Sequence, residues 1–298
     1  MTTYEIVNNY ITEMEVSLSQ NTIKSYVSIL TDFARICKNE KADRTKVIEY
    51  IKKLQNDGNS NNSIRTKIVV LKSFVKWASN NGFYDNDFAA TIKMPSAEYH
   101  VAERMSLEEV SAMLHEAPPK GTHSASFRRN KAIMELAIVT ASRVSAICSL
   151  KREDIDLENK TVRFKHTKRN KELIMPLTEA LCKSLSEYIN IERPKSLSAT
   201  DYLFVGEKPD HNGEYKPLSR QAIFNISKRY TEAACGKALS PHKLRHTSAS
   251  IQLESGLLSM DEISKNLGHS SISTTQRYAQ RLNDNGRKAA TVAVFEGL

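Results

Sequence analysis

The chain has 298 residues, of which 40% are hydrophobic and 26% charged, and this ordinary globular composition excludes a disordered, collagen-like or fibrous protein. Its formal net charge of +9 favours a polyanionic partner, either nucleic acid or an anionic membrane surface. Because no apolar run approaches the ~18 residues that cross a bilayer, and no signal peptide is evident, we expect a cytoplasmic protein without membrane attachment. The widely spaced cysteines form no C-x-x-C pair, which fits a reduced protein without a thiolate metal site.

The length is typical of about two domains, and the strongest break along the chain lies at Ile92–Arg104. This stretch contains Pro95 and several polar residues and has no helical apolar period, which is typical of a linker. We therefore predict a first domain over residues 1–94, a linker over 95–104 and a second domain over 105–298.

The first domain is predicted to be entirely helical. Along each segment, apolar residues recur at the spacing that places them on one face of a helix. Asn21 is the expected N-cap of the second helix, and Asn62 or Ser63 is the expected N-cap of the fourth. The predicted helices are Thr3–Ser17, Asn21–Lys38, Thr45–Gln55 and Ile64–Ala78.

The second domain combines helices with a β-hairpin. Ser106, followed three residues later by Glu109, forms a capping box that marks its first helix. The alternating apolar residues of Thr161–His166 and Glu172–Leu177 flank a polar connection, which is typical of a hairpin. The pair Ser240-Pro241 is typical of a helix N-terminus. Further helices are predicted over Arg129–Thr140, Thr178–Arg193, Ser219–Ala234, Pro241–Ser255, Asp261–Asn266 and Ser271–Leu282.

Side chains suited to phosphate chemistry gather in the C-terminal part of the chain. His242 and Arg245 are three residues apart, so they share a helix face. His269 follows Gly268, which suits a helix C-cap, and Tyr278 lies shortly beyond. A tyrosine phenol can attack a phosphodiester, an arginine can hold the non-bridging oxygens, and a histidine or lysine can move protons. This combination predicts a site for phosphoryl transfer.

At these residues the sequence resembles the tyrosine recombinases of the phage-integrase class, close in layout to the Xer-type and simple integrase members. The stretches HKLRHTSAS and LGHSSISTTQRYA match that family's two C-terminal motifs, and TASRVS resembles its first motif, with Arg143 as the first catalytic arginine. The hairpin TVRFKHTKRNKELIMPL resembles the family's β segment, with Lys168 at the catalytic lysine. The resemblance implies a mainly α fold with a small β-sheet: a C-shaped, two-domain DNA clamp that joins a helical, SAM-like core-binding domain to an α+β catalytic domain.

The resemblance also implies a mechanism. The tyrosine would attack a DNA phosphate, giving a 3′-phosphotyrosyl link and a free 5′-hydroxyl, while the two arginines hold the non-bridging oxygens. The lysine would protonate the leaving 5′-oxygen, His242 would assist proton transfer, and His269 would hydrogen-bond the phosphate. No metal, ATP or other cofactor is expected, because the bond energy stays in the protein–DNA link. The implied catalytic residues are Arg143, Lys168, His242, Arg245, His269 and Tyr278.

The implied partner is double-stranded DNA that carries an inverted-repeat recombination site. Four protomers of the chain would act on two DNA sites, and a second recombinase or an accessory protein could take part. The short apolar tail Ala289–Leu298 is expected to dock on a neighbouring protomer, with packing on its own domain as the alternative. The expected DNA contacts are Lys24, Arg65, Lys67, Lys72, Lys165, Arg169, Lys243 and Arg277.

The first motif departs from the family pattern. The family usually has glycine where this chain has Ala141, and an aliphatic residue where it has Ser142. It usually has an acidic residue, which helps to position the active-site groups, where this chain has Ala146. We expect this last difference to alter the geometry around Arg143 without changing the identity of the catalytic arginine.

Other functions remain as alternatives. A DNA-binding protein could keep this fold without catalysis, although the complete set of catalytic residue types argues against it. A relaxing topoisomerase could use the same tyrosine chemistry without paired DNA sites. The spacing of His242 and His246 would suit a metal pair, but Lys243 stands where the pattern H-E-x-x-H requires Glu and no third ligand is evident, so no metal site is expected.

Overall fold

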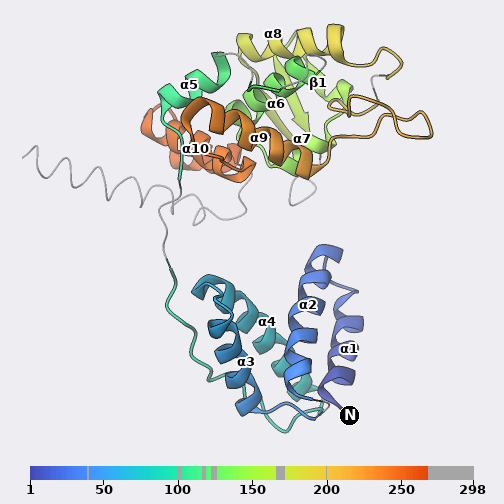
Figure 1. The fold of residues 1–298 in the computed structure, drawn as a ribbon, viewed down its shortest axis with the longest axis vertical. Helices are drawn as coiled ribbons and strands as arrows, with labels where there is room; N and C mark the ends of the chain where they lie inside the picture. Colours follow the sequence, from blue (N-terminus) through green and yellow to red (C-terminus); the bar gives the residue numbers. More distant parts are fainter. Residues whose placement is uncertain are drawn as a thin grey trace, which may run out of the picture. The chain divides into compact units, whose positions relative to one another are not determined.

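The computed structural model describes residues 1–38, 40–98, 103–115, 119–121, 126–165, 172–198 and 200–267. The chain divides into two compact units, Met1–His100 and Val101–Leu298 (Figure 1). Both are mainly helical and the second contains a small sheet, so the predicted fold class is confirmed. Among the helices of the described segments, none is long and apolar enough to cross a membrane.

The first unit is built from four helices at the predicted places. Ser19 and Ser60, rather than Asn21 and Asn62 or Ser63, are the N-caps of the second and fourth, so the predicted caps were wrong. Each serine accepts a hydrogen bond from the backbone N–H three residues later. The helices begin before their first apolar residue, which is why apolar spacing alone misplaced the caps. The helices are α1 (Thr3–Met14), α2 (Gln20–Ile36), α3 (Arg44–Asn56) and α4 (Asn61–Asn80).

Large buried side chains form the core of the first unit. The ring of Tyr10 meets the edge of Phe74 at 5.6 Å between centroids, and its hydroxyl is hydrogen-bonded to Ser73 at 2.9 Å. The chain beyond the helices returns along α4, where Arg65 donates to the carbonyl of Pro95 at 2.7 Å. The unit therefore has a hydrophobic core of its own.

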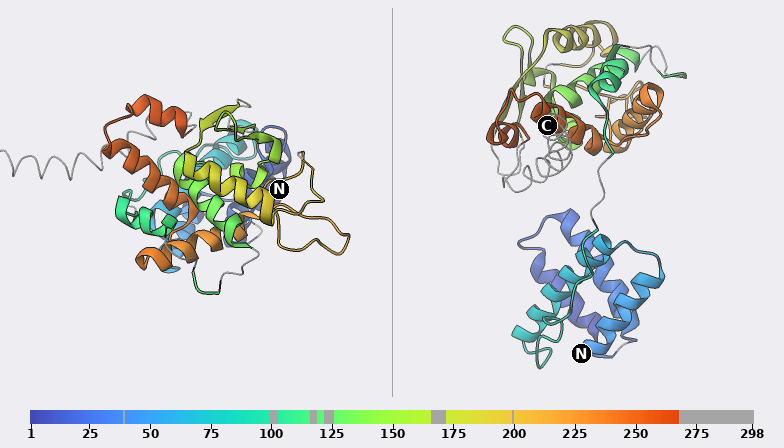
Figure 2. Two further views of the ribbon diagram at one scale, coloured as in Figure 1. Left: turned by 90° about the horizontal axis from the view of Figure 1, so that it is seen from above. Right: turned by 90° about the vertical axis from the view of Figure 1, so that its left-hand side faces the viewer.

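The second unit surrounds the long, buried helix α6 (Phe127–Thr140), which packs against α8 and α10 (Figures 1 and 2). The capping box of Ser106 and Glu109 is confirmed by both of its hydrogen bonds. The remaining helices are α5 (Leu107–His115), α7 (Val144–Ser149), α8 (Glu179–Glu187, continued by a π-turn over Tyr188–Glu192), α9 (Arg220–Cys235), α10 (Pro241–Glu254) and α11 (Met260–Asn266). The predicted helix Ser271–Leu282 lies outside the described residues.

The sheet is antiparallel with the strand order β1-β2-β3. The predicted hairpin is confirmed: β2 (Thr161–Phe164) pairs with β3 (Leu173–Pro176), with Val162 opposite Met175. The strand β1 (Ile155–Asp156) adds to the free edge of β2 and was not predicted, because a two-residue strand has no readable alternation. Val162 and Met175 face the core, so the register of the hairpin is fixed by the buried face of the sheet.

Candidate active site

The first candidate residue, Arg143, lies at the junction of two helices. Helix α6 ends at Thr140, and Ala141 then takes a left-handed conformation with φ 48° and ψ 29°. Helix α6 stops at this residue, and Arg143 adopts an extended conformation as the N-cap of α7. Its carbonyl accepts the backbone N–H of Ala146 at 2.9 Å, which begins the next helix. The side chain of Arg143 is half-buried at this corner.

Helix α10 presents the next two candidates. It begins as predicted, with Ser240 as the N-cap and Pro241 in the first turn. His242 in the first turn keeps an exposed surface, whereas Arg245 is only 4% exposed. One nitrogen of the Arg245 guanidinium donates to the carbonyl of Ala141 at 2.6 Å, and the other donates to the carbonyl of Leu267 at the end of α11. Arg245 therefore joins the corner before Arg143 to the segment that leads to His269.

Burial and the two arginines lower the pKa of His242. The pKa of His242 lies below its ordinary value of 6.5, first because surrounding protein removes water and then because the Arg245 and Arg143 cations oppose protonation. The His242 ring is partly exposed, yet burial and the two arginine charges still lower its pKa. The ring also meets His246 edge to face at 4.7 Å. A lowered pKa favours the uncharged imidazole of His242, which can accept a proton.

The base of the hairpin holds an acidic group that the sequence reasoning did not single out. The buried carboxylate of Asp154 accepts the backbone N–H of Lys151 at 2.9 Å and lies 2.8 Å from the ammonium of Lys165. Ala146 and these three residues contribute to the lining of a small cavity of about 50 Å³. An acid thus lies beside the position where the family usually carries one. In the sequence, Asp154 follows Lys151 by three residues. This spacing is too common to identify Asp154 as a site residue.

The predicted catalytic set is brought together in part. Arg245 donates to the carbonyl of Ala141, two residues before Arg143, and His242 lies three residues before Arg245 on α10, so the structure brings these three residues to one region. The other three predicted residues, Lys168, His269 and Tyr278, lie outside the described residues, as do Arg169, Arg277 and the tail Ala289–Leu298. Among the described residues, no group of three or more His, Cys, Asp or Glu side chains is placed to hold a metal ion.

Most of the predicted DNA contacts have partners within the chain. In the first unit Lys24 is exposed, while Lys67 donates to Asn59 at 3.0 Å and Lys72 donates to the carbonyl of Ala90 at 2.9 Å. In the second unit the ammonium of Lys165 contacts Glu153 and Asp154, and that of Lys243 contacts Glu103. DNA phosphates would have to replace these partners or share them. The same holds for Arg65, which donates to the carbonyl of Pro95.

Comparison with known proteins identifies the family. The model described as "Phage integrase family" matches residues 103–284, and the model described as "Phage integrase, N-terminal SAM-like domain" matches residues 9–82. The protein named "Tyrosine recombinase XerD" from Halalkalibacterium halodurans is 31% identical over 290 residues, which cover 92% of this chain and 93% of that protein.

Solved structures agree with this assignment at the level of the fold. A lambda integrase dimer bound to a COC′ core site gives a TM-score of 0.71 at 19% identity, over 93% of this chain and 77% of that one. A lambda integrase tetramer bound to a Holliday junction gives 0.69 at 18% identity over the same shares. The chain therefore belongs to the phage integrase family, whose members are tyrosine-type site-specific recombinases.

Proposed function

We propose that this recombinase cuts and rejoins DNA through a covalent link between Tyr278 and a 3′-phosphate. The phenol oxygen attacks the phosphorus atom, the bond from phosphorus to the 5′-oxygen breaks, and a 5′-hydroxyl leaves. His242 takes up the phenol proton, and Lys168 supplies a proton to the departing oxygen. A 5′-hydroxyl from a partner strand then attacks the phosphotyrosine, which reverses the bond changes and reseals the DNA.

The two arginines and His269 stabilise the transition state in this proposal. Charge grows on the non-bridging oxygens during phosphoryl transfer, and fixed cations in a partly buried site stabilise it without having to reorganise. Arg143 and Arg245 are always charged and present forked donors that match two phosphate oxygens. His269 adds a hydrogen bond to the same phosphate.

The observation that carries the proposal is that Arg143, at the junction of α6 and α7, lies near His242 and Arg245 of helix α10, because Arg245 donates to the carbonyl of Ala141. Arg245 is buried, and its guanidinium donates to the carbonyls of Ala141 and Leu267. Burial lowers the pKa of His242 first, and the Arg245 and Arg143 cations lower it further. Such a concentration of positive charge around a neutral base suits an anionic diester.

The proposal extends to the DNA and to the assembly. The substrate is double-stranded DNA with inverted repeats, and four protomers act on two sites in the cytoplasm. Residues 1–94 form the core-binding domain, residues 105–298 form the catalytic domain, and 95–104 link them, so that the protein closes on DNA as a clamp. The basic side chains named above contact phosphates, so binding should weaken steeply as salt rises.

Covalent trapping tests the proposal. The protein is incubated with fragmented host DNA and denatured, and the DNA that remains linked to it is sequenced, with Tyr278→Phe in parallel. We expect linked DNA only from the unchanged protein, enriched in one inverted-repeat site. Equal trapping by both proteins would exclude Tyr278 as the nucleophile. Binding of DNA without trapping by either protein would favour the binding-only alternative, and relaxation of supercoils without site preference would favour the topoisomerase.

A further inference from the structure

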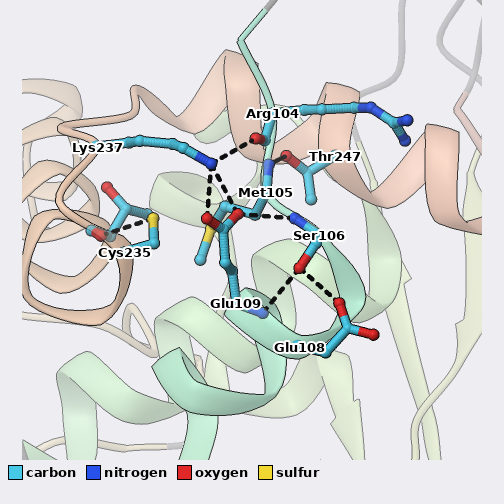
Figure 3. Close-up of polar contacts among 9 residues, drawn as sticks. Arg104, Met105, Ser106, Glu108, Glu109, Cys235, Lys237 and Thr247 are labelled. Atoms are coloured by element: carbon cyan, nitrogen blue, oxygen red, sulfur yellow. Dashed lines mark hydrogen bonds and ion pairs between the residues drawn. The ribbon is translucent and has the colours of Figure 1, made fainter.

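Glu103, Arg104 and Met105, which precede the first helix of the second unit, contact helix α10. Met105 is fully buried, in a cluster that includes Leu244 of α10. Its backbone N–H donates to the hydroxyl of Thr247 at 3.2 Å (Figure 3). That hydroxyl in turn donates to the carbonyl of Lys243 at 3.0 Å. Thr247 is also fully buried, so water cannot replace this bond. The entering segment is therefore tied to the middle of α10 by a buried contact.

Charged contacts hold the same segment to both ends of α10. The carboxylate of Glu103 lies 2.8 Å from the ammonium of Lys243 in the first turn, and the guanidinium of Arg104 lies 2.7 Å from Glu254 in the last. Lys237, just before α10, donates to the carbonyl of Arg104 at 3.5 Å (Figure 3). Because these side chains are half-exposed, each ion pair adds little by itself. Together they hold the segment to the first turn, the middle and the last turn of the helix.

The contacts fall on one stripe of α10, away from the active-site residues. Lys243, Thr247 and Glu254 are four and seven residues apart, a spacing that returns to the same face of a helix. At about 100° per residue, His242 and Arg245 project from a different side. The helix thus carries catalytic groups on one side and the entering chain on another.

We propose that Thr247, through its bond to Met105, is a positioning residue for the recombination reaction. The bond and its flanking ion pairs set the position of α10, so that Arg245 reaches the carbonyl of Ala141 and His242 stays beside Arg143. This inference rests on the proposed function, in which these side chains act on the phosphate. A displacement of about 1 Å in a catalytic group can cost about 100-fold in rate, so a small shift of α10 suffices for a measurable effect.

Thr247→Val tests the inference, because valine keeps the shape of the side chain but cannot accept the Met105 N–H. Thr247→Ser keeps the hydroxyl and serves as the rescue. The matched control is Thr3→Val in the first unit: Thr3 is equally buried, and its hydroxyl bonds the carbonyl of Glu40 at 2.7 Å. For each full-length protein, the rate of covalent complex formation is measured at saturating DNA, on a nicked site recovered by trapping. The half-saturating DNA concentration and the midpoint of thermal unfolding are measured alongside.

We expect Thr247→Val to lower the saturated rate about 10-fold or more while the half-saturating DNA concentration stays within about twofold. Thr247→Ser should restore most of the rate, and Thr3→Val should lose thermal stability without losing rate. An unchanged rate in Thr247→Val would overturn the inference and leave the proposed function standing. The inference would also be overturned if Thr3→Val lost as much rate as Thr247→Val. It would likewise be overturned if Thr247→Val changed only the half-saturating DNA concentration. An unchanged protein that forms no covalent complex would overturn the proposed function and this inference with it.

Discussion

Ala141 occupies a backbone conformation that L-residues rarely adopt, and it does so where the family usually has glycine. Its φ of 48° turns the chain from α6 toward Arg143, and its carbonyl accepts the bond from Arg245. The methyl group is fully buried beside Ala249 and Ile263. The strain of the turn and the burial of the methyl group therefore act in opposite directions on stability.

Substitutions at Ala141 should separate these two effects. In Ala141→Gly, relief of about 1–2 kcal/mol of left-handed strain is offset by the loss of about 0.8 kcal/mol of methyl burial and by the greater freedom of glycine in the unfolded chain. We expect Ala141→Gly to change the free energy of unfolding by no more than about 1 kcal/mol. Ala141→Val adds branching and bulk at the same site and should destabilise by about 2–4 kcal/mol. Urea unfolding measures both, and equal stabilities for the two variants would contradict the left-handed turn.

The lowered pKa of His242 predicts a specific titration. The unfolded chain should take up a proton at about the ordinary value of 6.5, while the folded site resists it, so stability is lost as the pH falls below that value. In an NMR titration of labelled histidines, with His242→Gln for assignment, we expect a midpoint below 6.5. Arg143→Met removes one of the opposing cations and should move the midpoint upward. A midpoint that Arg143→Met leaves unchanged would show that the side chains of Arg143 and His242 do not interact.

The buried guanidinium of Arg245 should not be replaceable by an ammonium. Arg245→Lys keeps the charge but cannot bridge two carbonyls and present a fork to phosphate, so we expect covalent complex formation to fall about 100-fold. Arg193→Lys is the matched control, since Arg193 is also buried and donates to the carbonyls of Leu197 and Ser198. The control should lose stability by about 1–3 kcal/mol with its cleavage rate unchanged. Equal losses of rate would indicate a general effect on folding.

At the level of elements, apolar periodicity predicted the helices of the first unit and most of those of the second. It failed for α7, because six residues contain too few turns to reveal a helical period. It failed for β1 because two residues are too few to reveal an alternation. It also misplaced the N-caps of α2 and α4, which depend on a serine in extended conformation rather than on apolar spacing. The motifs indicated Arg143, His242 and Arg245. The buried acid Asp154 and the Thr247 contact could not be predicted, since both depend on residues that meet only in the folded chain.

The start of α6 depends on a cap supplied from far along the sequence. Ser126 makes no capping bond with its side chain there. The buried carboxylate of Glu192 accepts the backbone N–H groups of Arg128 and Arg129 at 2.8 and 2.9 Å. A negative charge at a helix N-terminus is stabilising because it faces the positive end of the helix dipole. Glu192 thereby fixes one end of the helix whose other end delivers Arg143.

Removal of this cap should therefore be costly. We expect Glu192→Ala to lower the free energy of unfolding by about 2 kcal/mol, and Glu192→Gln, which keeps an acceptor but no charge, to lower it by about half as much. Glu187, one turn earlier and half-exposed, supplies the control: Glu187→Ala should change the stability by less than about 0.5 kcal/mol. Urea unfolding measures all three. A silent Glu192→Ala would show that α6 does not need the cap.

At the scale of the whole molecule, the two units have separate hydrophobic cores. The cluster in the first unit is drawn only from residues before Pro95, and the clusters in the second only from residues after Arg104. Each unit is large enough to bury a core of its own. Without DNA, the units should therefore unfold as separate cooperative steps rather than in one two-state transition.

The single tryptophan allows this to be measured. Trp77 lies in α4 and packs against Phe83 with 5.4 Å between ring centroids, so its fluorescence reports the first unit alone, whereas far-UV circular dichroism reports both. Leu71 and Leu136 are fully buried, one in each unit, and truncation of either should cost about 2–5 kcal/mol. Leu71→Ala should shift the fluorescence transition to lower urea, while Leu136→Ala should leave it in place and shift the remaining dichroism change. A fluorescence transition that follows Leu136→Ala would show that the units unfold together, and that their stabilities are coupled before any DNA is bound.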